Sequence, residues 1–141
     1  MRLILCLSLA SLPLLVSHSE KQWRQLLGPE RYRVMREGGT EKAFSGEHLR
    51  QTAVGLYLCA ACTSPLFHSE DKYEEPYCGW PTFSKPAKKE SVEYREDWKL
   101  PFKRYEVLCR SCGSHLGHVF PDGPPPKNLR FTINSITLIF K

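Results

Sequence analysis

The feature of the sequence that most constrains its fold is a pair of Cys-x-x-Cys motifs, Cys59/Cys62 and Cys109/Cys112, with 46 residues between them. Small or polar residues follow each motif and suit a tight turn, which directs two thiolates to one side. Two such turns supply the four soft ligands of a tetrahedral zinc site. We therefore expect Zn(2+) to join the two parts of the chain, with metal binding coupled to folding. Disulfides are the alternative that these cysteines leave open.

The amino terminus has the pattern of a cleavable export signal. Arg2 precedes an apolar run over residues 3–16, and small polar residues follow. The run of about 14 residues is shorter than the roughly 18 to 20 that a membrane-crossing helix needs, so cleavage is favoured over an uncleaved anchor. We expect residues 1–19 to be removed, together with Cys6. Residues 20–141 would then be exported, periplasmic or secreted, with no stable membrane span after cleavage.

Length, charge and cysteine number limit what the mature chain can be. With 141 residues there is room for one compact domain, and we expect a monomer. The net charge of +5 is spread over interleaved acidic and basic residues instead of a basic stripe, so no nucleic-acid partner is expected. Five cysteines remain after signal cleavage. In an oxidising compartment, one thiol must therefore stay unpaired or be used chemically.

The apolar pattern predicts a mainly β body behind a helical start. Residues 20–36 have helical spacing in two short amphipathic pieces that break at Gly28-Pro29. Later apolar segments are short, β-branched or aromatic, and separated by Gly, Pro and Asp turns, as is typical of strands. A small barrel or two packed sheets with N-terminal helices is the favoured architecture. The expected strands cover residues 56–58, 65–67, 92–95, 104–108, 118–120, 130–133 and 135–140.

Four stretches of the sequence carry a resemblance to a known family. They are residues 59–67, the Cys-Gly-Trp-Pro-Thr-Phe segment at 78–83, residues 109–126 and the Arg-Phe-Thr-Ile-Asn-Ser segment at 130–135. Together they resemble the methionine-R-sulfoxide reductases (MsrB), over nearly all of the chain from about residue 20. The resemblance implies a small twisted β-sheet barrel with a structural zinc remote from the reactive centre.

The same resemblance implies an activity, the reduction of methionine-R-sulfoxide in oxidised proteins. In the family a cysteine thiolate attacks the sulfoxide sulfur, accepts its oxygen and becomes a sulfenic acid. A second thiol then closes a disulfide with it, and a thioredoxin-like dithiol restores the pair. Oxidised protein substrates and such a reductant are therefore the expected partners.

Five further residues match positions of the family's pocket. Trp80 resembles the aromatic wall that holds the substrate methyl group. His115 and His118 resemble the pair that protonates or hydrogen-bonds the sulfoxide oxygen. Asn134 would hydrogen-bond within the pocket, and Arg130 would stabilise a thiolate. Without the resemblance, a single tryptophan is more often a residue of the hydrophobic core than of a binding site, and either histidine alone could have a purely structural role.

The sequence departs from the family at the attacking residue. The family's nucleophile, cysteine or selenocysteine, stands at the third position of the motif in which this chain has Thr132. A threonine hydroxyl is far from ionised at neutral pH and has no stable way to accept the oxygen, so the usual mechanism cannot run through it. Cys78 stands where many family members have the resolving cysteine, and it must border the same pocket or be able to swing to it.

Three hypotheses follow for the function of the chain. In the first, an oxidoreductase, Cys78 has become the attacking thiol and is reduced directly by an external thiol. In the second, a retired reductase binds oxidised methionine through Trp80 and the histidines without turnover. In the third, a zinc-stapled interaction domain has lost both abilities.

Overall fold

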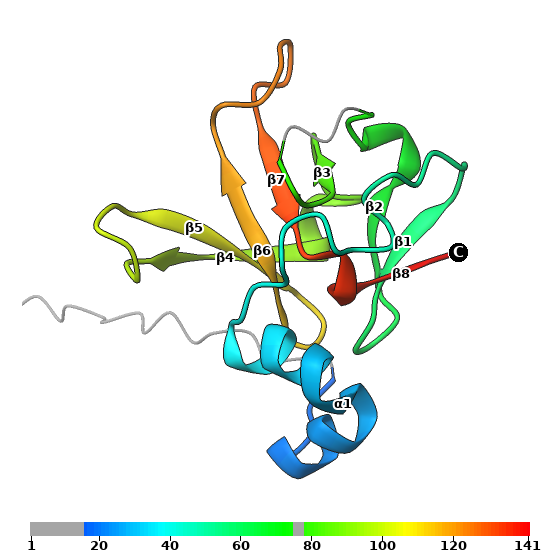
Figure 1. The fold of residues 1–141 in the computed structure, drawn as a ribbon, viewed down its shortest axis with the longest axis vertical. Helices are drawn as coiled ribbons and strands as arrows, with labels where there is room; N and C mark the ends of the chain where they lie inside the picture. The colour runs from blue at the N-terminus through cyan, green and yellow to red at the C-terminus, as the bar shows by residue number, and fades with distance from the viewer. Residues whose placement is uncertain (1–15, 75–77) are drawn as a thin grey trace, which may run out of the picture.

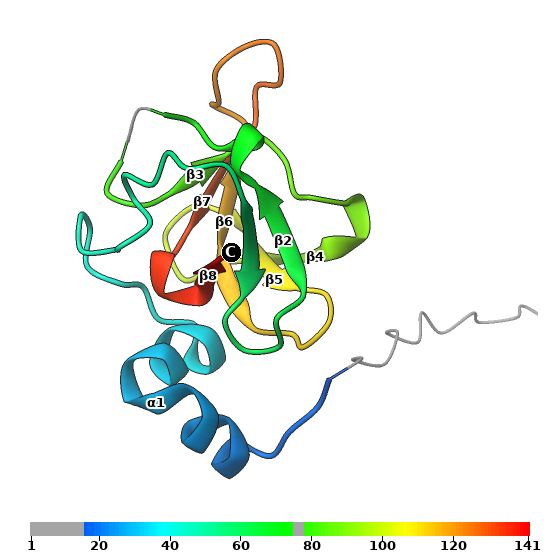
Figure 2. The ribbon, with the colours of Figure 1, turned by 90° about the vertical axis from the view of Figure 1, so that its right-hand side faces the viewer.

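The computed structural model describes residues 16–74 and 78–141, and it confirms the mainly β prediction. The strands form two antiparallel sheets, one of order β2-β1-β8 and one of order β3-β7-β6-β5-β4, and they do not close into one barrel. The helix α1 lies beneath both sheets in the two ribbon views (Figures 1 and 2). The elements are α1 (Glu20–Glu37), β1 (Leu56–Cys59), β2 (Pro65–His68), β3 (Thr82–Phe83), β4 (Val92–Asp97), β5 (Arg104–Cys109), β6 (His115–Phe120), β7 (Arg130–Ile133) and β8 (Leu138–Phe140), with short 3-10 helices η1 (Ser69–Asp71), η2 (Lys89–Ser91) and η3 (Ser135–Thr137).

The helix α1 contains the break that the sequence predicts. Gly28 has a φ of 74° and interrupts the helical conformation directly before Pro29, so that two helical pieces meet at a kink. Ser19 begins the helix with a capping box to Gln22, and Gly38 ends it in the left-handed conformation. Its buried side chains pack below the sheets; they are Trp23, Leu27, Tyr32, Val34 and Met35.

Aromatic side chains join the two sheets across the core. Phe67 of β2 stacks on Phe83 of β3, with ring centroids 4.4 Å apart, and Tyr57 of β1 meets Phe83 edge-on at 5.2 Å. Phe131 of β7 completes the group against Phe67 at 6.0 Å. All four rings are buried, and their offset and edge-on arrangements are those that aromatic pairs prefer.

Two short segments differ from the sequence prediction. The expected strand over residues 135–140 forms a strand only at Leu138–Phe140, because η3 turns the chain first. The Thr137 hydroxyl donates to the Asn134 carbonyl at 2.7 Å and holds that turn, a local bond that competes with strand pairing. The strand β3 was missed because its two residues, Thr82 and Phe83, are too few to show a period.

One strand contains an extra residue that matters for the site. In the pairing of β5 with β6, Val107 faces Gly117 whereas Leu108 faces His115, so Leu116 is the additional residue of a bulge. Without the bulge, residues 115 and 118 would point to opposite faces of the sheet. With it, the rings of His115 and His118 lie on one face, 5.5 Å apart.

The residues just before α1 contact the folded domain. The Val16 backbone N–H donates to the Ser111 carbonyl at 2.8 Å, and the His18 ring meets the buried Trp23 ring edge-on at 4.6 Å. Of the expected export signal at 1–19, residues 1–15 lie outside the described part of the chain. Over the residues that the structure describes, no helix combines the length and the apolar character that a membrane crossing requires.

The contribution of the capping box to the stability of the domain can be measured. In a chain that starts at Val16, Ser19→Ala should lower the free energy of unfolding by about 1 kcal/mol, because a backbone donor of the first turn loses its acceptor. Urea unfolding followed by circular dichroism measures the change. The matched control is Ser17→Ala, which alters an exposed serine outside the cap and should leave stability unchanged. Equal stabilities of the two variants would contradict the role of the cap.

Candidate functional site

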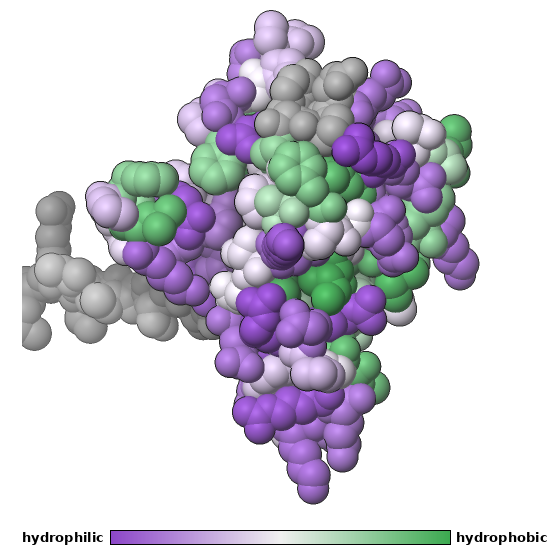
Figure 3. Space-filling view, viewed as in Figure 1, coloured by the Kyte–Doolittle hydropathy of each residue, from purple (hydrophilic) through white to green (hydrophobic). Residues whose placement is uncertain are grey.

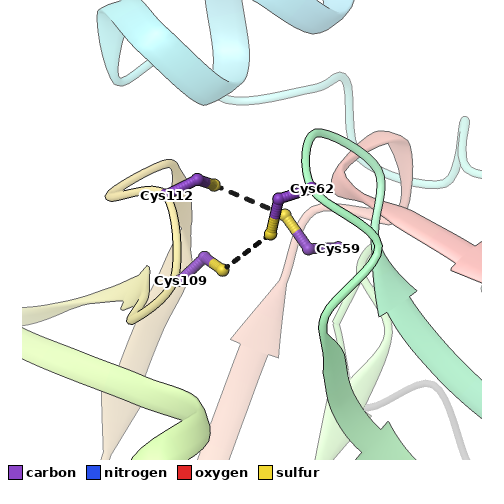
Figure 4. A group of neighbouring side chains, drawn as sticks. All are labelled: Cys59, Cys62, Cys109 and Cys112. Atoms are coloured by element: carbon purple, nitrogen blue, oxygen red, sulfur yellow. Dashed lines mark hydrogen bonds between the residues drawn. The ribbon is translucent and has the colours of Figure 1, made fainter. Parts of the chain in front are cut away.

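The four cysteines of the two motifs meet at the end of the sheets that faces the helix (Figure 4). Cys59 and Cys62 come from the β1–β2 turn, and Cys109 and Cys112 come from the β5–β6 turn. Their sulfur atoms lie within 4.8 Å of one another, with 3.8 Å between Cys59 and Cys112 and 3.6 Å between Cys62 and Cys109. Tetrahedral ligands at a Zn–S distance of 2.3 Å are about 3.8 Å apart, whereas a disulfide needs about 2.05 Å. The four thiols are unbridged and fit a metal ion.

The two cysteine turns have the same backbone construction. In the first, the Thr63 N–H donates to the Cys59 carbonyl at 2.8 Å, and in the second Gly113 donates to Cys109 at the same distance. Thr63 and Gly113 both have positive φ values, 65° and 73°. Glycine adopts this conformation freely, whereas a threonine is strained in it. Thr63 therefore adopts a strained backbone conformation in the turn that places the sulfur atoms of Cys59 and Cys62 on one side.

A cavity of about 180 Å³ lies against β7 and against the part of β6 that is farther from the cysteine turn. Its lining gathers six residues that the sequence predicts for the site, namely Cys78, Trp80, His118, Arg130, Thr132 and Asn134. Thr40, Arg104, Gly117 and Phe120 complete it. Gly117 is required where β6 approaches β7, because a Cβ atom there would lie 2.0 Å from the Thr132 carbonyl oxygen. Segments far apart in the sequence thus meet around one small volume.

The strand β7 presents alternate residues to the cavity. Phe131 and Ile133 are buried in the core, whereas Arg130 and Thr132 line the cavity, as the period of two in a strand requires. The Arg130 Nη1 atom donates to the Thr132 hydroxyl at 2.9 Å and lies 3.9 Å from the Cys78 sulfur. One guanidinium therefore contacts both Cys78 and Thr132, the residue that the resemblance places at the position of the family nucleophile.

The Arg130 side chain is held from two sides. Its Nε and Nη2 atoms donate to the two carboxylate oxygens of Asp122 at 2.9 and 3.0 Å, and its guanidinium lies 4.6 Å from the centre of the Phe120 ring. The hydrogen bond from Arg130 lowers the pKa of Asp122, and the same contact raises the pKa of Arg130. The bidentate pair fixes the direction in which the remaining nitrogen points, which is into the cavity.

The His118 imidazole is fixed by a hydrogen bond to a carboxylate that the sequence analysis did not find. Its Nε2 atom lies 2.8 Å from Asp97 Oδ2, and Arg104 donates to the same oxygen at 3.0 Å. A backbone hydrogen bond from Lys99 lowers the pKa of Asp97 to about 2, assisted by His118 and Arg104. Burial lowers the pKa of His118, and the Asp97 carboxylate opposes that shift. His118 is therefore a mainly neutral imidazole at pH 7 beside a permanent carboxylate.

His115 lies outside this cavity. Its Nδ1 atom lies 2.8 Å from Glu106 Oε1, and the pair borders a separate groove of about 740 Å³ between α1 and the β4–β5 hairpin. The hydrogen bond from His115 lowers the pKa of Glu106. The two histidines thus lie on one face of the sheet but border different hollows, because Glu106 and Asp97 hold them apart.

A backbone segment positions Trp80 and Asn134. The Trp80 indole N–H donates to the Glu41 carbonyl at 3.1 Å, and the Glu41 N–H donates to Asn134 Oδ1 at 3.0 Å. The Asn134 amide also donates to the Leu116 carbonyl at 3.0 Å. The Glu41 side chain is buried and accepts from the Ile136 N–H, and burial raises its pKa. Glu41 therefore links two walls of the cavity through its main chain.

Sequence reasoning missed Asp97, Arg104 and Glu41 for one physical reason. Each acts through a partner more than ten residues away or on a neighbouring strand. A signal existed for the first two, because Asp97 and Arg104 are opposite charges at the ends of two segments that pair as a hairpin. For Glu41 no signal existed, since its backbone makes the contacts with the cavity residues.

The Asp97 contact predicts a shift in the titration of His118. Asp97→Asn removes the charge that raises the pKa of His118 while burial continues to lower it, so the imidazole should titrate at a lower pH than in the natural chain. NMR titration of the imidazole resonances measures the change. Glu96→Gln, which removes a charge from the adjacent exposed residue, is the matched control and should leave the titration of His118 nearly unchanged. An unchanged or higher midpoint in Asp97→Asn would contradict the assigned contact.

Comparison with known proteins gives a consistent result over most of the chain. The SelR domain family model matches residues 27–141. Proteins named peptide methionine sulfoxide reductase MsrB are similar to the chain. The one from Azotobacter vinelandii is 50% identical over 119 residues, which cover 84% of this chain and 89% of that protein. The one from Thiobacillus denitrificans is 50% identical over 122 residues, which cover 86% of this chain and 92% of that protein. The Agrobacterium fabrum protein of that name is 46% identical over 126 residues, covering 89% and 93%. The chain belongs to the SelR family, the methionine-R-sulfoxide reductases called MsrB.

Proposed function

We propose that this chain reduces methionine-R-sulfoxide in oxidised proteins and that Cys78 is the thiol that attacks the substrate. Family membership supports the reductase class. The observation that carries the assignment of the thiol is the contact of Cys78 with Arg130 at 3.9 Å in the cavity that Trp80 also lines. The guanidinium donates its Nη1–H toward the Cys78 sulfur and is positively charged where the reacting thiol would lie. The other described cysteines lie in the four-thiol cluster.

The proposed reaction balances with an external thiol. The Cys78 thiolate attacks the sulfoxide sulfur and, with one proton, takes over the oxygen, so that the methionine thioether leaves and Cys78 becomes a sulfenic acid. Two equivalents of an external thiol, such as a thioredoxin-like dithiol, then return Cys78 to the thiol and release water and a disulfide. Cys78 also borders a second hollow of about 420 Å³ with Asp122, Gly123, Pro124 and Arg130, which offers the reductant an approach on the other side of the guanidinium.

The other cavity residues suit supporting roles. The Trp80 ring provides an apolar wall for the substrate methyl group, and its hydrogen bond to Glu41 keeps the ring in place. The His118 Nε2–H is directed at Asp97, so the imidazole first takes up a proton at Nδ1, with the Asp97 carboxylate stabilising the cation; it can then hydrogen-bond the sulfoxide oxygen and pass that proton to it as the S–O bond breaks. Asn134 attaches its wall of the cavity to β6, because its side-chain amide donates a hydrogen bond to the Leu116 carbonyl.

A retired binding domain is the second candidate, and the bond between Arg130 and Thr132 favours it. The guanidinium nitrogen that contacts Cys78 at 3.9 Å makes its short bond, 2.9 Å, to the Thr132 hydroxyl. A hydroxyl held in this way occupies the family's reactive position without being able to accept the oxygen. The cavity would then bind methionine sulfoxide without reducing it. A zinc-stapled interaction domain without this affinity is the third alternative.

Kinetics of three variants separates these functions. With dithiothreitol and R- or S-methionine sulfoxide, the natural chain should turn over the R epimer alone, and Cys78→Ser should abolish that turnover. Thr132→Cys should raise kcat by at least about tenfold, because a thiolate is restored beside Arg130 with Cys78 available as the resolving thiol. Thr132→Ser keeps a hydroxyl and is the matched control.

Each other outcome of this assay identifies a different function. If the natural chain binds a sulfoxide peptide without turnover and Thr132→Cys is active, the chain is a retired binding domain. If neither binding nor rescue occurs, the interaction domain is correct. Turnover that survives Cys78→Ser would exclude the proposed nucleophile.

We also propose that the four-thiol cluster holds a structural Zn(2+). Support comes from the donor set and from sulfur spacings of 3.6 and 3.8 Å, which suit tetrahedral zinc. The ion would hold the β1–β2 and β5–β6 turns together and leave no open coordination position for substrate. Export through the amino-terminal signal belongs to the same proposal, since a bound metal would protect these thiols from oxidation in an oxidising compartment.

Elemental analysis and unfolding test the metal. The purified chain should contain one zinc per molecule, and a strong chelator should lower the unfolding temperature by at least about 10 °C, because metal binding and folding are coupled. Cys109→Ser should lose the zinc, whereas Cys78→Ser, the matched control outside the cluster, should retain it. Disulfides among these four cysteines in mass mapping, with no zinc, would exclude this site.

A further inference from the structure

The β4–β5 hairpin projects from the body of the molecule (Figure 1), and its turn carries exposed apolar side chains. Among the described residues, ten large hydrophobic side chains are exposed, and five belong to this hairpin. Trp98, Leu100 and Phe102 lie in its turn with exposed fractions of 64%, 41% and 57%. Figure 3 shows hydrophobic atoms gathered at that tip. Single exposed apolar residues are ordinary, but a contiguous cluster on a projecting element marks an interaction site.

The tip is held in a fixed position. Residues of β4 and β5 pair in unbroken register from Val92 opposite Cys109 to Asp97 opposite Arg104. Asp97 accepts the Lys99 backbone N–H at 2.9 Å at the start of the turn, and the Trp98 indole donates to Glu96 at 3.2 Å. A partner that binds this tip therefore loses little free energy to the ordering of the hairpin.

The base of the hairpin turn borders the cavity, and Trp98 lines the neighbouring groove of about 740 Å³. Arg104 lines the cavity, and Asp97, its partner at the base of the turn, holds His118 inside it. Trp98 follows Asp97 directly in the chain. The cavity volume of about 180 Å³ is well below the roughly 300 to 1,000 Å³ of pockets that enclose a whole small ligand. A single side chain can enter it, and the rest of a polypeptide must lie on the surface around the mouth.

We infer that the tip formed by Trp98, Leu100 and Phe102 is a docking surface for polypeptide substrates that have large apolar side chains next to the oxidised methionine. The inference rests on the proposed function in that the cavity takes the sulfoxide side chain. Such neighbours are typical of core segments exposed by unfolding, so the surface selects unfolded over folded oxidised proteins. Aromatic side chains at a rigid tip supply large contact areas and dominate the binding free energy of interfaces of this kind.

The charges at the tip favour a polypeptide over an anionic membrane surface. Over residues 96–104, two acidic side chains face three basic ones. Lys103 lies 3.6 Å from Glu96 and Arg104 lies 3.0 Å from Asp97, so most of the charge is paired. Membrane attachment through a loop of this size requires an excess of unpaired cations as well as apolar residues. Lys103 additionally lies over the Trp98 and Tyr105 rings at 5.9 and 5.2 Å.

Binding and turnover of matched peptides test the inference. The binding probe is a fluorescein-labelled peptide in which methionine-R-sulfoxide is flanked by leucine and phenylalanine, compared with one flanked by serine and glycine. The double variant Trp98→Ser/Phe102→Ser should weaken binding of the apolar peptide by about tenfold or more in fluorescence anisotropy and leave binding of the polar peptide unchanged. Val54→Ser, at a fully exposed valine outside the hairpin, is the matched control and should change neither. Turnover of N-acetyl-methionine-R-sulfoxide should be the same in all three chains.

The outcomes separate this inference from the proposed function. If the double variant binds the apolar peptide as tightly as the natural chain, or loses both peptides equally, the docking surface is excluded. If the double variant loses affinity for the apolar peptide while the natural chain reduces no sulfoxide, the surface stands and the reductase assignment fails. No binding of either peptide by the natural chain overturns the inference. Loss of sedimentation with phosphatidylglycerol vesicles, at unchanged peptide affinity, would show a membrane surface instead.

Discussion

The convergence of four thiols is the contact on which the rest of the structure depends. Cys59 and Cys62 lie at the β1–β2 turn of the smaller sheet and Cys109 and Cys112 at the β5–β6 turn of the larger one, so the cluster links the two sheets at one end. The helix α1 joins at the same place, because Arg36 donates to the Cys112 carbonyl at 2.9 Å. The strand β6 starts directly beyond and carries a wall of the cavity. The position of the cavity is thus set by a cluster that lies outside it.

At the other end, one guanidinium organises the cavity. Arg130 is fixed by Asp122 and the Phe120 ring, and it offers one nitrogen to both Thr132 and Cys78. Arg130 therefore brings Thr132, which the resemblance places at the position of the attacking cysteine, and the Cys78 thiol to one positive charge. The proposed reactivity of Cys78 rests on this contact.

The fold and the site could be predicted to different degrees. The spacing of the cysteine motifs indicated the four-thiol cluster, and the resemblance of the segment at 130–135 indicated that Arg130 and Thr132 belong to one site, because both signals are local in the sequence. The two-residue strand β3 and the turn at η3 left no such signal. The partnership of Asp97 with His118 depends on strand pairing and could not be derived from either segment alone.

The bulge at Leu116 has a consequence for how this sheet can change. It places two imidazoles, His115 and His118, on the same side of the sheet, and each has its own carboxylate partner. That arrangement depends on the bulge as well as on the identity of the two residues. If Leu116 were drawn into regular pairing, the two histidines, three residues apart, would point to opposite faces of the sheet although every chemical group in the chain stayed the same. The local backbone geometry of β6 therefore decides whether the two imidazoles can share a face.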